Sequence, residues 1–371
     1  MSYTSYEIVK YSPEFKSQIV ELQTHLWSPD LSVNAAYLEW KYEQNPYMNT
    51  PLIHLVLCEG QVVGMRGIYG SKWQIGSPGQ TFPGSCAGDS VVAPDHRNRG
   101  LSKKLMIAQL NDLTNSDYIY SFVLSANPIS CLNLLKMGWR SIGSMQRMRW
   151  EARQRPISSR ALRYATRLPF FSSPKKLNPF YFLDKNAMKR QGKATHYVSV
   201  KKTARPETMA ELVKRLCTDG RIRHVRDLDY FSWRFNNPLS RYRFLFWEKS
   251  RLEGYLVLQT RFNNDTLRVN IVDWEATSLE ARSDLLEAVL CLGNFDALSI
   301  WTATLADEVK ILLKKSGFKV LSETENVMQY RPTVLVRPVR DDMLKTDWTF
   351  EGRRLLDLAN WDLRMINSDG T

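Results

Sequence analysis

The stretch Asp89-Ser-Val-Val-Ala-Pro-Asp-His-Arg-Asn-Arg-Gly-Leu-Ser102 decides how the rest of the chain is interpreted. The residues before it have the pattern of a β-strand, and Lys103–Leu110 has the pattern of a helix. A strand that enters a helix through a short, glycine-containing loop directs several backbone N–H groups to one point, at the positive end of the helix dipole. The sequence therefore predicts a site for a pyrophosphate group at this turn.

The length and composition are those of a globular protein with about two domains. The chain has 371 residues, of which 43% are hydrophobic and 24% charged, and no apolar run is long enough for a transmembrane helix. The N-terminus lacks the basic and apolar regions of a signal peptide. Five cysteines are scattered without metal-ligand spacing, which predicts a cytoplasmic protein and argues against disulfides, a zinc site or any other metal cofactor.

The charge is strongly basic and unevenly distributed. The formal net charge is +13, which favours anionic partners such as phosphorylated small molecules. Residues 151–193 contain eleven Lys and Arg but only two acidic residues, mixed with Pro and aromatic residues. We interpret this segment as a linker or surface insertion, and the alternative is a peripheral contact with an anionic membrane. A nucleic-acid reader is disfavoured, because the basic residues do not fall on a recognisable reading element.

The first 150 residues show an ordered series of elements. Strands are expected over 6–11, 52–58, 61–69, 86–93, 117–125 and 139–150, and helices over about 13–26, 34–44, 103–110 and 128–136. The order is β-α-α-β-β-β-α-β-α-β, with the predicted phosphate loop between the fourth strand and the third helix.

This order and three local patterns resemble the GNAT superfamily of acyl-CoA-dependent N-acyltransferases. Arg97-x-x-Gly100-x-Ser102 is similar to the family's Arg/Gln-x-x-Gly-x-Gly/Ala loop, and Lys136-Met-Gly138-Trp139 is similar to the end of its Tyr-x-Lys-x-Gly-Phe pattern. The surrounding sequence is most similar to that of tandem GNAT proteins that contain the motif Val-Ala-Pro-x-His-Arg-x-Arg-Gly-Leu. The resemblance implies a mixed, mostly antiparallel twisted sheet flanked by helices (α+β, or α/β), and direct transfer of an acyl group from acyl-CoA to an amine.

The resemblance also assigns the residues that would hold coenzyme A. The fourth strand should splay from its neighbour, so that backbone groups near Val91 and Val92 pair with pantetheine, while the loop amides hold the pyrophosphate. Asn127 has two interpretations, a pantetheine contact or a cap on the following helix. The candidate CoA-binding residues are Val91, Val92, Arg97, Asn98, Arg99, Gly100, Leu101, Ser102 and Asn127.

The general base and acid are less well defined. Asp89 is the one carboxylate inside the fourth strand, so it is the candidate catalytic base, and the alternative is a buried structural acid. Strand alternation places Asp89 on one face with Val91. Leu134 occupies the position at which many GNAT enzymes carry a tyrosine that protonates the departing thiolate.

An internal repeat divides the chain. Tyr37-Leu-Glu-Trp-Lys-Tyr42 has an echo in Tyr230-Phe-Ser-Trp-Arg-Phe235, and Lys315-Ser-Gly-Phe318 echoes Lys136-Met-Gly-Trp139. Because these aromatic residues recur at helical spacing in both halves, we expect them to be buried in the core. The stretch 270–282 replaces the phosphate loop in the second copy. It has no glycine and carries Asp273, Glu275 and Glu280, which predicts that CoA binds only in the first copy.

The sequence thus predicts four segments: an N-terminal GNAT domain (1–150) that binds acyl-CoA, the basic segment (151–193), a degenerate GNAT-like domain (194–332) and a tail (333–371) that packs on the body. The expected activity is N-acetyltransfer from acetyl-CoA to an amine of a small, anionic acceptor, for example a nucleotide-linked amino sugar. The alternative is a catalytically silent CoA-sensing or interaction module, and the oligomeric state is left open. In some tandem relatives the C-terminus reaches the first active site, which is a hypothesis for Thr371 here.

Overall fold

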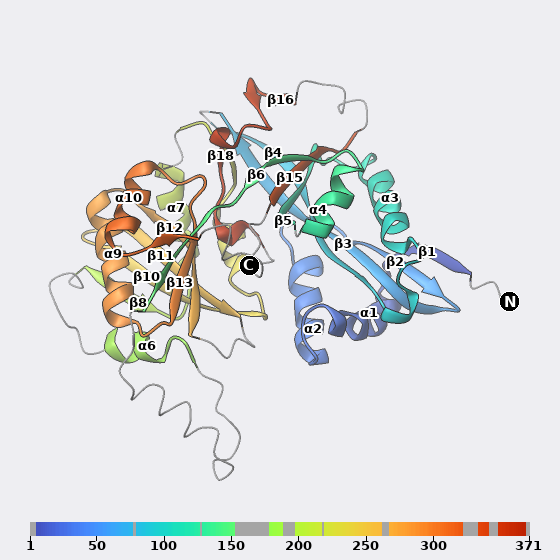
Figure 1. The fold of residues 1–371 in the computed structure, drawn as a ribbon, viewed down its shortest axis with the longest axis horizontal. Helices are drawn as coiled ribbons and strands as arrows, with labels where there is room; N and C mark the ends of the chain where they lie inside the picture. The colour runs from blue at the N-terminus through green and yellow to red at the C-terminus, as the bar shows by residue number, and fades with distance from the viewer. Residues whose placement is uncertain are drawn as a thin grey trace, which may run out of the picture.

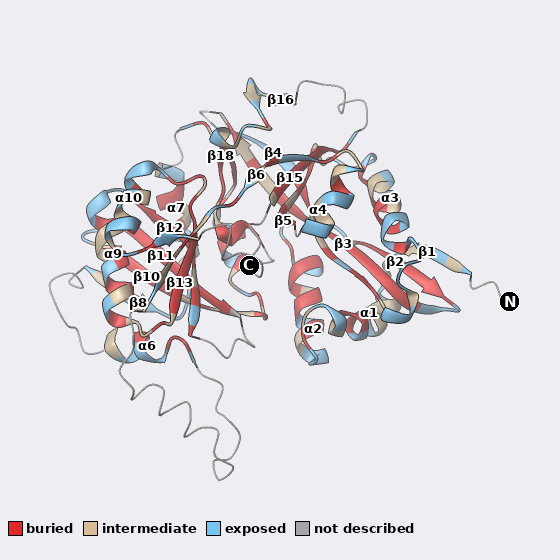
Figure 2. Cartoon of the chain, in the orientation of Figure 1, coloured by how far each residue is buried: buried red, intermediate tan, exposed pale blue. Residues whose placement is uncertain are grey.

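A computed structural model of the chain describes residues 5–76, 79–126, 128–152, 178–187, 197–216, 219–261, 267–321, 333–340 and 348–368. The molecule consists of two lobes, each with a twisted sheet and flanking helices, and the described end of the chain lies between them (Figure 1). The buried residues follow both sheets and the contact between the lobes (Figure 2).

The first sheet is built mainly from the N-terminal half. Its path runs β1 (Tyr6–Lys10), β2 (Leu52–Cys58), β3 (Gln61–Ile75), β4 (Gln80–Val92), β5 (Tyr120–Ala126), β15 (Thr333–Pro338) and β6 (Arg140–Ser144). Helices cover both faces: α1 (Lys16–Leu22) and α2 (Leu31–Leu38) lie on one, and α3 (Leu101–Leu113) and α4 (Pro128–Leu135) lie on the other (Figure 1).

The second sheet repeats this order with the second half of the chain. Its path runs β8 (Val198–Lys201), β10 (Ser240–Glu248), β11 (Leu252–Arg261), β12 (Arg268–Ala276), β13 (Ala297–Trp301), β7 (Arg147–Glu151) and β14 (Lys319–Val320). Its helices are α6 (Tyr181–Ala187), α7 (Pro206–Leu216), α8 (Leu228–Arg234), α9 (Leu279–Leu292) and α10 (Asp307–Lys315). The duplication expected from the sequence repeat is therefore present in the topology.

The two sheets exchange one strand each. The single strand expected over 139–150 is in fact two strands: β6 stays in the first sheet, whereas β7 crosses to the second and pairs with β13 and β14. In return β15, from the end of the second half, inserts between β5 and β6. The sequence could not show this exchange, because the alternation of one strand does not identify its partner. The exchange ties the lobes together through backbone hydrogen bonds.

A second connection runs through the last described residues. β9 (Ile222–His224), from the second half, pairs with β3 of the first sheet, and β18 (Trp361–Asp362) pairs with β9. Between β15 and β18 lies a small hairpin of β16 (Thr349–Phe350) and β17 (Arg353–Arg354). Within its described residues the C-terminal tail packs on the body, as its apolar residues predict, since Trp361 and Ile366 are fully buried.

Several boundaries differ from the sequence expectation for local reasons. The second helix begins three residues earlier than expected, at Leu31, because the Asp30 carboxylate caps it by accepting from the Ser32 amide at 2.9 Å. It continues as a π-turn over Glu39–Glu43. The fourth strand starts at Gln80 instead of 86, because β3 is long enough to pair with it from Ile75 onward.

The repeated tryptophans form the centre of the contact between lobes. Trp40 and Trp233 stack with ring centroids 4.9 Å apart and an interplanar angle of 8°. The Trp40 indole N–H donates to the Trp233 carbonyl at 2.9 Å, and the Trp233 indole N–H donates to the Trp40 carbonyl at 2.6 Å. This reciprocal pair relates the two copies by a local two-fold arrangement and buries both rings. The expectation that the repeated aromatic residues are core is confirmed for this pair.

Replacing Trp233 with alanine is expected to destabilise the whole protein by about 3–5 kcal/mol, because it removes a stacked ring and the hydrogen bond from its indole N–H to the Trp40 carbonyl at the lobe contact. Urea unfolding followed by circular dichroism measures the effect. Tyr181→Ala is a suitable control, since Tyr181 is 54% exposed and its loss should change stability by less than about 0.5 kcal/mol. Equal midpoints for the two variants would show that the stack does not hold the lobes together.

Candidate functional site

The fourth and fifth strands separate where the sequence places the acyl-CoA site. β4 and β5 run parallel and pair over Gly84–Cys86 and Tyr120–Phe122. Beyond Cys86 the register of β4 is with β3 alone, so the edge of β4 that faces β5 carries no strand partner as far as Val92 within the described residues. An unpaired strand edge is a template for an extended amide-containing ligand. The structure thus places Val91 and Val92 on such an edge.

The loop after β4 has the backbone of an anion-binding turn. Gly100 forms the N-cap of α3 with φ of 71°, and Asn98 has φ of 61°, so two residues of the loop are left-handed. Within the described residues no amide from Asn98 to Ser102 donates a hydrogen bond, whereas Lys103 N–H and the following amide donate to Gly100. Leu101 is buried and anchors the start of the helix. These unpaired amides at a helix N-terminus fit a pyrophosphate.

Both loop arginines are held by the backbone. Arg97 Nε donates to the Val92 carbonyl at 3.0 Å, and Arg99 Nη2 donates to the Asp95 carbonyl at 3.3 Å. The Arg99 guanidinium also lies over the Tyr6 ring, 5.8 Å from its centroid. The two cations therefore stay close to the loop, where they add charge to an anion site.

Asp89 lies on the face of the sheet that α1, α2 and the second lobe cover. A β-bulge separates the pairs Ile68–Ala87 and Arg66–Ser90, so two residues of β4 oppose one residue of β3. Because the bulge interrupts the alternation, Cys86 and Val91 share a core cluster on one face, although strict alternation from Asp89 would place Cys86 on the other. The bulge was not predictable from the strand pattern.

The Asp89 carboxylate is fully buried and paired. Its Oδ1 accepts from Lys41 Nζ at 2.8 Å, and its Oδ2 accepts from Gln23 Nε2 at 3.3 Å. Both side chains of the Asp89–Lys41 ion pair are 0% exposed. Lys41 Nζ also lies 5.2 Å from the ring centroids of Tyr37 and of Tyr69. The sequence does not reveal the role of Lys41, because its partner Asp89 is 48 residues away along the chain.

The other predicted site residues do not contact the Asp89–Lys41 pair or fall outside the described residues. Asn127 falls outside the described residues, and so does Thr371, the C-terminal residue. Leu134 is buried in a cluster with Met106, Ala126, Trp139 and Leu335, so this position offers no hydroxyl group. Most of 151–193 is also outside the described ranges; within α6, Leu183 is buried while Tyr181 and Phe182 are exposed. The membrane contact stays a prediction.

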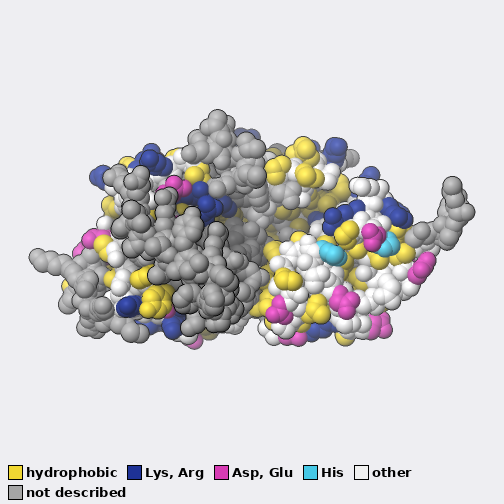
Figure 3. All heavy atoms as spheres, turned by 60° about the horizontal axis from the view of Figure 1, so that its bottom comes forward, with side chains coloured by type: hydrophobic (Ala, Val, Ile, Leu, Met, Phe, Trp, Pro, Cys, Tyr) yellow, Lys and Arg dark blue, Asp and Glu magenta, His cyan; other side chains and the backbone are white. Residues whose placement is uncertain are grey.

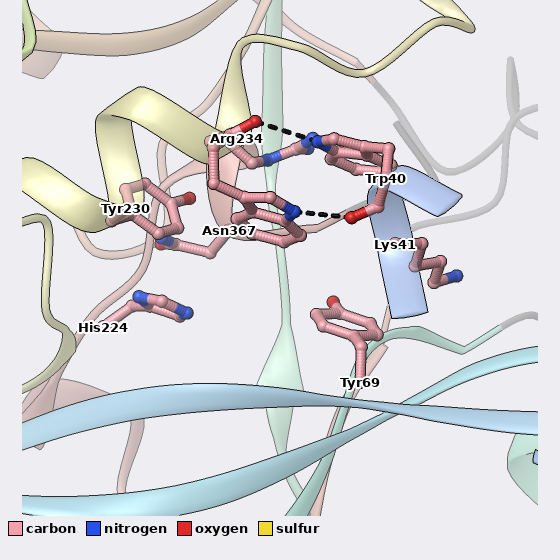
Figure 4. Close-up of a pocket in the computed structure, with 8 residues that line it drawn as sticks. Trp40, Lys41, Tyr69, His224, Tyr230, Arg234 and Asn367 are labelled. Carbon is pink, nitrogen blue, oxygen red and sulfur yellow. Dashed lines mark hydrogen bonds between the residues drawn. The ribbon is translucent and has the colours of Figure 1, made fainter. Parts of the chain in front are cut away.

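A pocket lies between the lobes beside the Asp89–Lys41 pair (Figure 4). The first half contributes Trp40, Lys41 and Tyr69, the second contributes His224, Tyr230, Trp233 and Arg234, and the tail contributes Asn367. The walls are therefore largely aromatic, and each of the three parts of the chain is needed to close them. The repeated motif contains all of these residues except Tyr69, His224 and Asn367, which carried no sequence signal.

In the second copy, the corresponding gap between two parallel strands is filled by the tail. β12 and β13 run parallel and pair only over Arg268–Ile271 and Ala297–Ile300. Arg364 and Met365 of the tail line the cavity beyond this point. The tail is fixed there by Tyr230, whose hydroxyl donates to the Ile366 carbonyl at 3.0 Å. The chain's own C-terminal segment thus takes the place that the first copy leaves open.

The acidic residues of the second copy have a different role from the expected one. Asp273 and Glu275 were expected to repel pyrophosphate, but both are buried and paired with arginines. Arg226 contacts both carboxylates, and Arg364 bonds to Glu275 at 3.2 Å. The arginines hold the pKa of Glu275 well below its usual range despite the opposing effect of burial. These acids anchor the tail, and Glu280 stays at the surface.

The imidazole of His224 is neutral near pH 7. Burial lowers its pKa from 6.5 to about 4; the Val225 carbonyl and Asp227 oppose the shift, while Arg226 and Arg234 add to it. The folded pKa is below the unfolded one, so the unfolded chain binds an extra proton between pH 6.5 and 4. As the pH falls from 6.5 to 4, the contribution of His224 to the free energy of unfolding should therefore decrease by about 3 kcal/mol.

Urea titrations from pH 7 to pH 4, on the protein and on His224→Phe, measure this contribution. Burial also lowers the pKa of His54, which adds a change of the same sign to both proteins. The difference between the two proteins isolates His224. Parallel pH dependences would contradict a buried, neutral imidazole.

Known proteins with a similar sequence or structure agree with this description of the fold. A family model described as "Acetyltransferase (GNAT) domain" matches residues 8–140. None of the curated proteins matches the sequence. Among the helices of the described ranges, none is both long and apolar enough to cross a membrane.

Solved structures share the fold over most of the chain. A probable N-acyltransferase of Enterococcus faecalis gives a TM-score of 0.58 at 12% identity, over 91% of this chain and 73% of that one. A GCN5-related N-acetyltransferase from Anabaena variabilis gives 0.58 at 14% identity, with the same coverage of 91% and 73%. A tandem GNAT protein from the clavulanic acid biosynthesis pathway gives 0.54 at 12% identity, over 91% and 99%. Residues 8–140 thus match the model of a GNAT acetyltransferase domain, and the chain as a whole shares the fold of these solved structures.

Proposed function

We propose that the protein is an N-acyltransferase that transfers an acetyl group from acetyl-CoA to an amine of a small, anionic acceptor. The observation that carries the proposal is the combination of an unpaired β4 edge with a run of unpaired amides over Asn98–Ser102. The edge suits the two amides of pantetheine, and the turn suits the pyrophosphate. Acetyl-CoA would supply the acyl group as a thioester, and the family match supports this class of reaction.

The pocket between the lobes is the proposed acceptor site. Tyr69 lines it and lies opposite Cys86, the last residue of β4 that pairs with β5. An amine in the pocket is therefore next to the end of the proposed pantetheine path. The pocket itself has room for little more than a water-sized group, which suits the amino group of an acceptor, and the net charge of +13 favours an acceptor with phosphate or carboxylate groups. A nucleotide-linked amino sugar fits this description.

On one face of the N-terminal lobe the positive charge does not form a continuous surface. On the face shown in Figure 3, Lys and Arg side chains of the N-terminal lobe, at the right, are interspersed with Asp and Glu. A local anion site fits this distribution better than a broad nucleic-acid surface, which needs a basic stripe.

Asp89 is proposed as a structural acid rather than as the base. Both of its oxygens accept from buried donors, and its side chain has no exposed surface. A general base must come within hydrogen-bond reach of the proton that it removes. The Lys41–Asp89 pair instead fixes the wall between the pocket and β4.

Thiol release from acetyl-CoA with a panel of amines tests the proposal. Turnover that depends on both substrates supports the acyltransferase. The second candidate, a silent CoA-sensing module, is favoured by the buried Leu134 and the paired Asp89, which leave two customary catalytic roles unfilled. Tight CoA binding without thiol release for any amine would select the sensor.

A further inference from the structure

His224 occupies a wall of the pocket between the lobes and belongs to the second half of the chain. Its ring packs against Tyr230 with centroids 4.6 Å apart and against Trp73 at 5.3 Å. Figure 4 shows the imidazole on the side of the pocket opposite Tyr69, below Tyr230 and Asn367. Residues of the second half thus border a site at which residues of the first half are proposed to bind the acyl donor.

The backbone fixes the position of this ring. His224 is the last residue of β9 and pairs with Trp73 of β3. On its other side β9 pairs with β18 through Ile222 and Trp361. The next amide, that of Val225, donates to the Lys72 carbonyl at 2.8 Å. A side chain that starts from a strand paired on both sides is held more firmly than one on a loop.

The hydrogen bonds of His224 define its tautomer. Nδ1 lies 2.9 Å from the Val225 carbonyl oxygen, and because a carbonyl can only accept, Nδ1 carries the proton. Nε2 then presents a lone pair, and no donor among the described residues bonds to it. Burial keeps the ring neutral, as its lowered pKa shows. A ligand that satisfies Nε2 must therefore be a donor, such as an N–H group.

The location of the pocket indicates which N–H group this is. Lys41 connects the pocket wall to Asp89 on β4, and Tyr69 connects it to Cys86, where the pairing of β4 with β5 ends. Under the proposed function, the thioester carbonyl lies where that pairing ends. An amine that attacks it has to approach from the pocket side, which His224 borders.

We propose that Nε2 of His224 accepts a hydrogen bond from the N–H of the acceptor amine and so orients its nitrogen toward the acyl group. This inference rests on the proposed function and extends it to the acceptor side. The substrate class is a primary amine, whose amino group is what the narrow pocket beside Trp233 and Tyr69 would take. The second GNAT-like half would then supply substrate recognition, while the first supplies the acyl-donor site.

Two substitutions distinguish the effect of the Nε2 lone pair from the effect of ring packing. His224→Phe keeps an aromatic ring beside Tyr230 and Trp73 but removes the acceptor, and His224→Gln keeps an acceptor near the position of Nε2. The probe is whichever of benzylamine, phosphoethanolamine and glucosamine releases thiol fastest with the unaltered protein. We expect His224→Phe to lower kcat/KM for that amine by about 10- to 100-fold, with unchanged CoA affinity, and His224→Gln to recover much of the loss.

The outcomes distinguish this inference from the proposed function. Equal kcat/KM for the amine in His224→Phe and the unaltered protein overturns the role of His224 and leaves the acyltransferase intact. Absence of thiol release from the unaltered protein overturns the proposed function itself.

A measurement on the unaltered protein covers the case in which His224→Phe does not fold. In the ¹⁵N spectrum of histidine-labelled protein, the Nε2 resonance of His224 should shift on addition of the same amine, while Nδ1 stays in place. An unchanged Nε2 resonance at saturating amine contradicts the inference.

Discussion

Replacing Lys41 with methionine is expected to lower the free energy of unfolding by about 3–5 kcal/mol. The substitution leaves the Asp89 carboxylate inside the protein without its cation, and both side chains are 0% exposed in the structure. Methionine has nearly the same length, so the loss reports the charge and not a cavity. Urea unfolding at pH 7 measures the effect, and thiol release from the same sample should fall with it, because the pair forms part of the pocket wall.

Two further variants show whether the pair itself is responsible. Lys16 forms ion pairs with Glu39 and Glu43 at the surface, at 2.9 Å each, so Lys16→Met should cost less than about 1 kcal/mol. Adding Asp89→Leu to Lys41→Met should restore most of the lost stability, since apolar replacement of a whole buried pair is often neutral. Destabilisation by Lys41→Met that matches the Lys16 control would show that Asp89 is not buried with its cation.

Replacing Gly100 with valine is expected to weaken CoA binding by about 100-fold. A β-branched residue is strongly disfavoured at the left-handed φ of 71° that Gly100 adopts at the N-cap of α3. The loop must change its backbone to relieve this strain, and the amides of Asn98–Ser102 then no longer converge. Each lost charge-assisted hydrogen bond to pyrophosphate weakens binding by about 1.5–3 kcal/mol, or roughly tenfold or more. Calorimetric titration with CoA measures the change.

Gly60→Val is a closely matched control for this substitution. Gly60 also has a left-handed φ, of 77°, and at both glycines the position that a Cβ would take is open, with nothing beyond the neighbouring residues within 4 Å. Gly60 lies in the turn between β2 and β3, away from the loop. Its valine variant should lose a similar amount of stability but keep its affinity for CoA. Equal affinity losses in the two variants would mean that general destabilisation, not the loop, accounts for the effect.

The features that the sequence predicts correctly are those that local chemistry determines. The alternation and turn residues of the first 126 residues are sufficient to predict the order of the strands and helices. The loop from Arg97 to Ser102 is identifiable because a strand, a glycine and a helix start follow one another along the chain. The repeat of Trp40 in Trp233 correctly indicates two related halves and a buried aromatic pair.

The features that were missed depend on partners far apart in the sequence. Nothing in the alternation of 139–150 shows that β7 crosses to the other sheet, because strand pairing is chosen by the assembled fold. The bulge at Gly88 and Asp89 places Cys86 on the same face as Val91, whereas strict alternation would place it on the other face. Asp273 and Glu275 were expected to repel pyrophosphate, but Arg226 and Arg364 pair with them in the interior.

The most direct test of the account is a calorimetric titration of the intact chain with CoA. The loop of the first half is open to the ligand, whereas the equivalent cleft of the second half contains Arg364 and Met365 of the tail. The account therefore predicts saturable heat with one CoA bound per chain. Absence of heat, or two equivalents of CoA per chain, would contradict it.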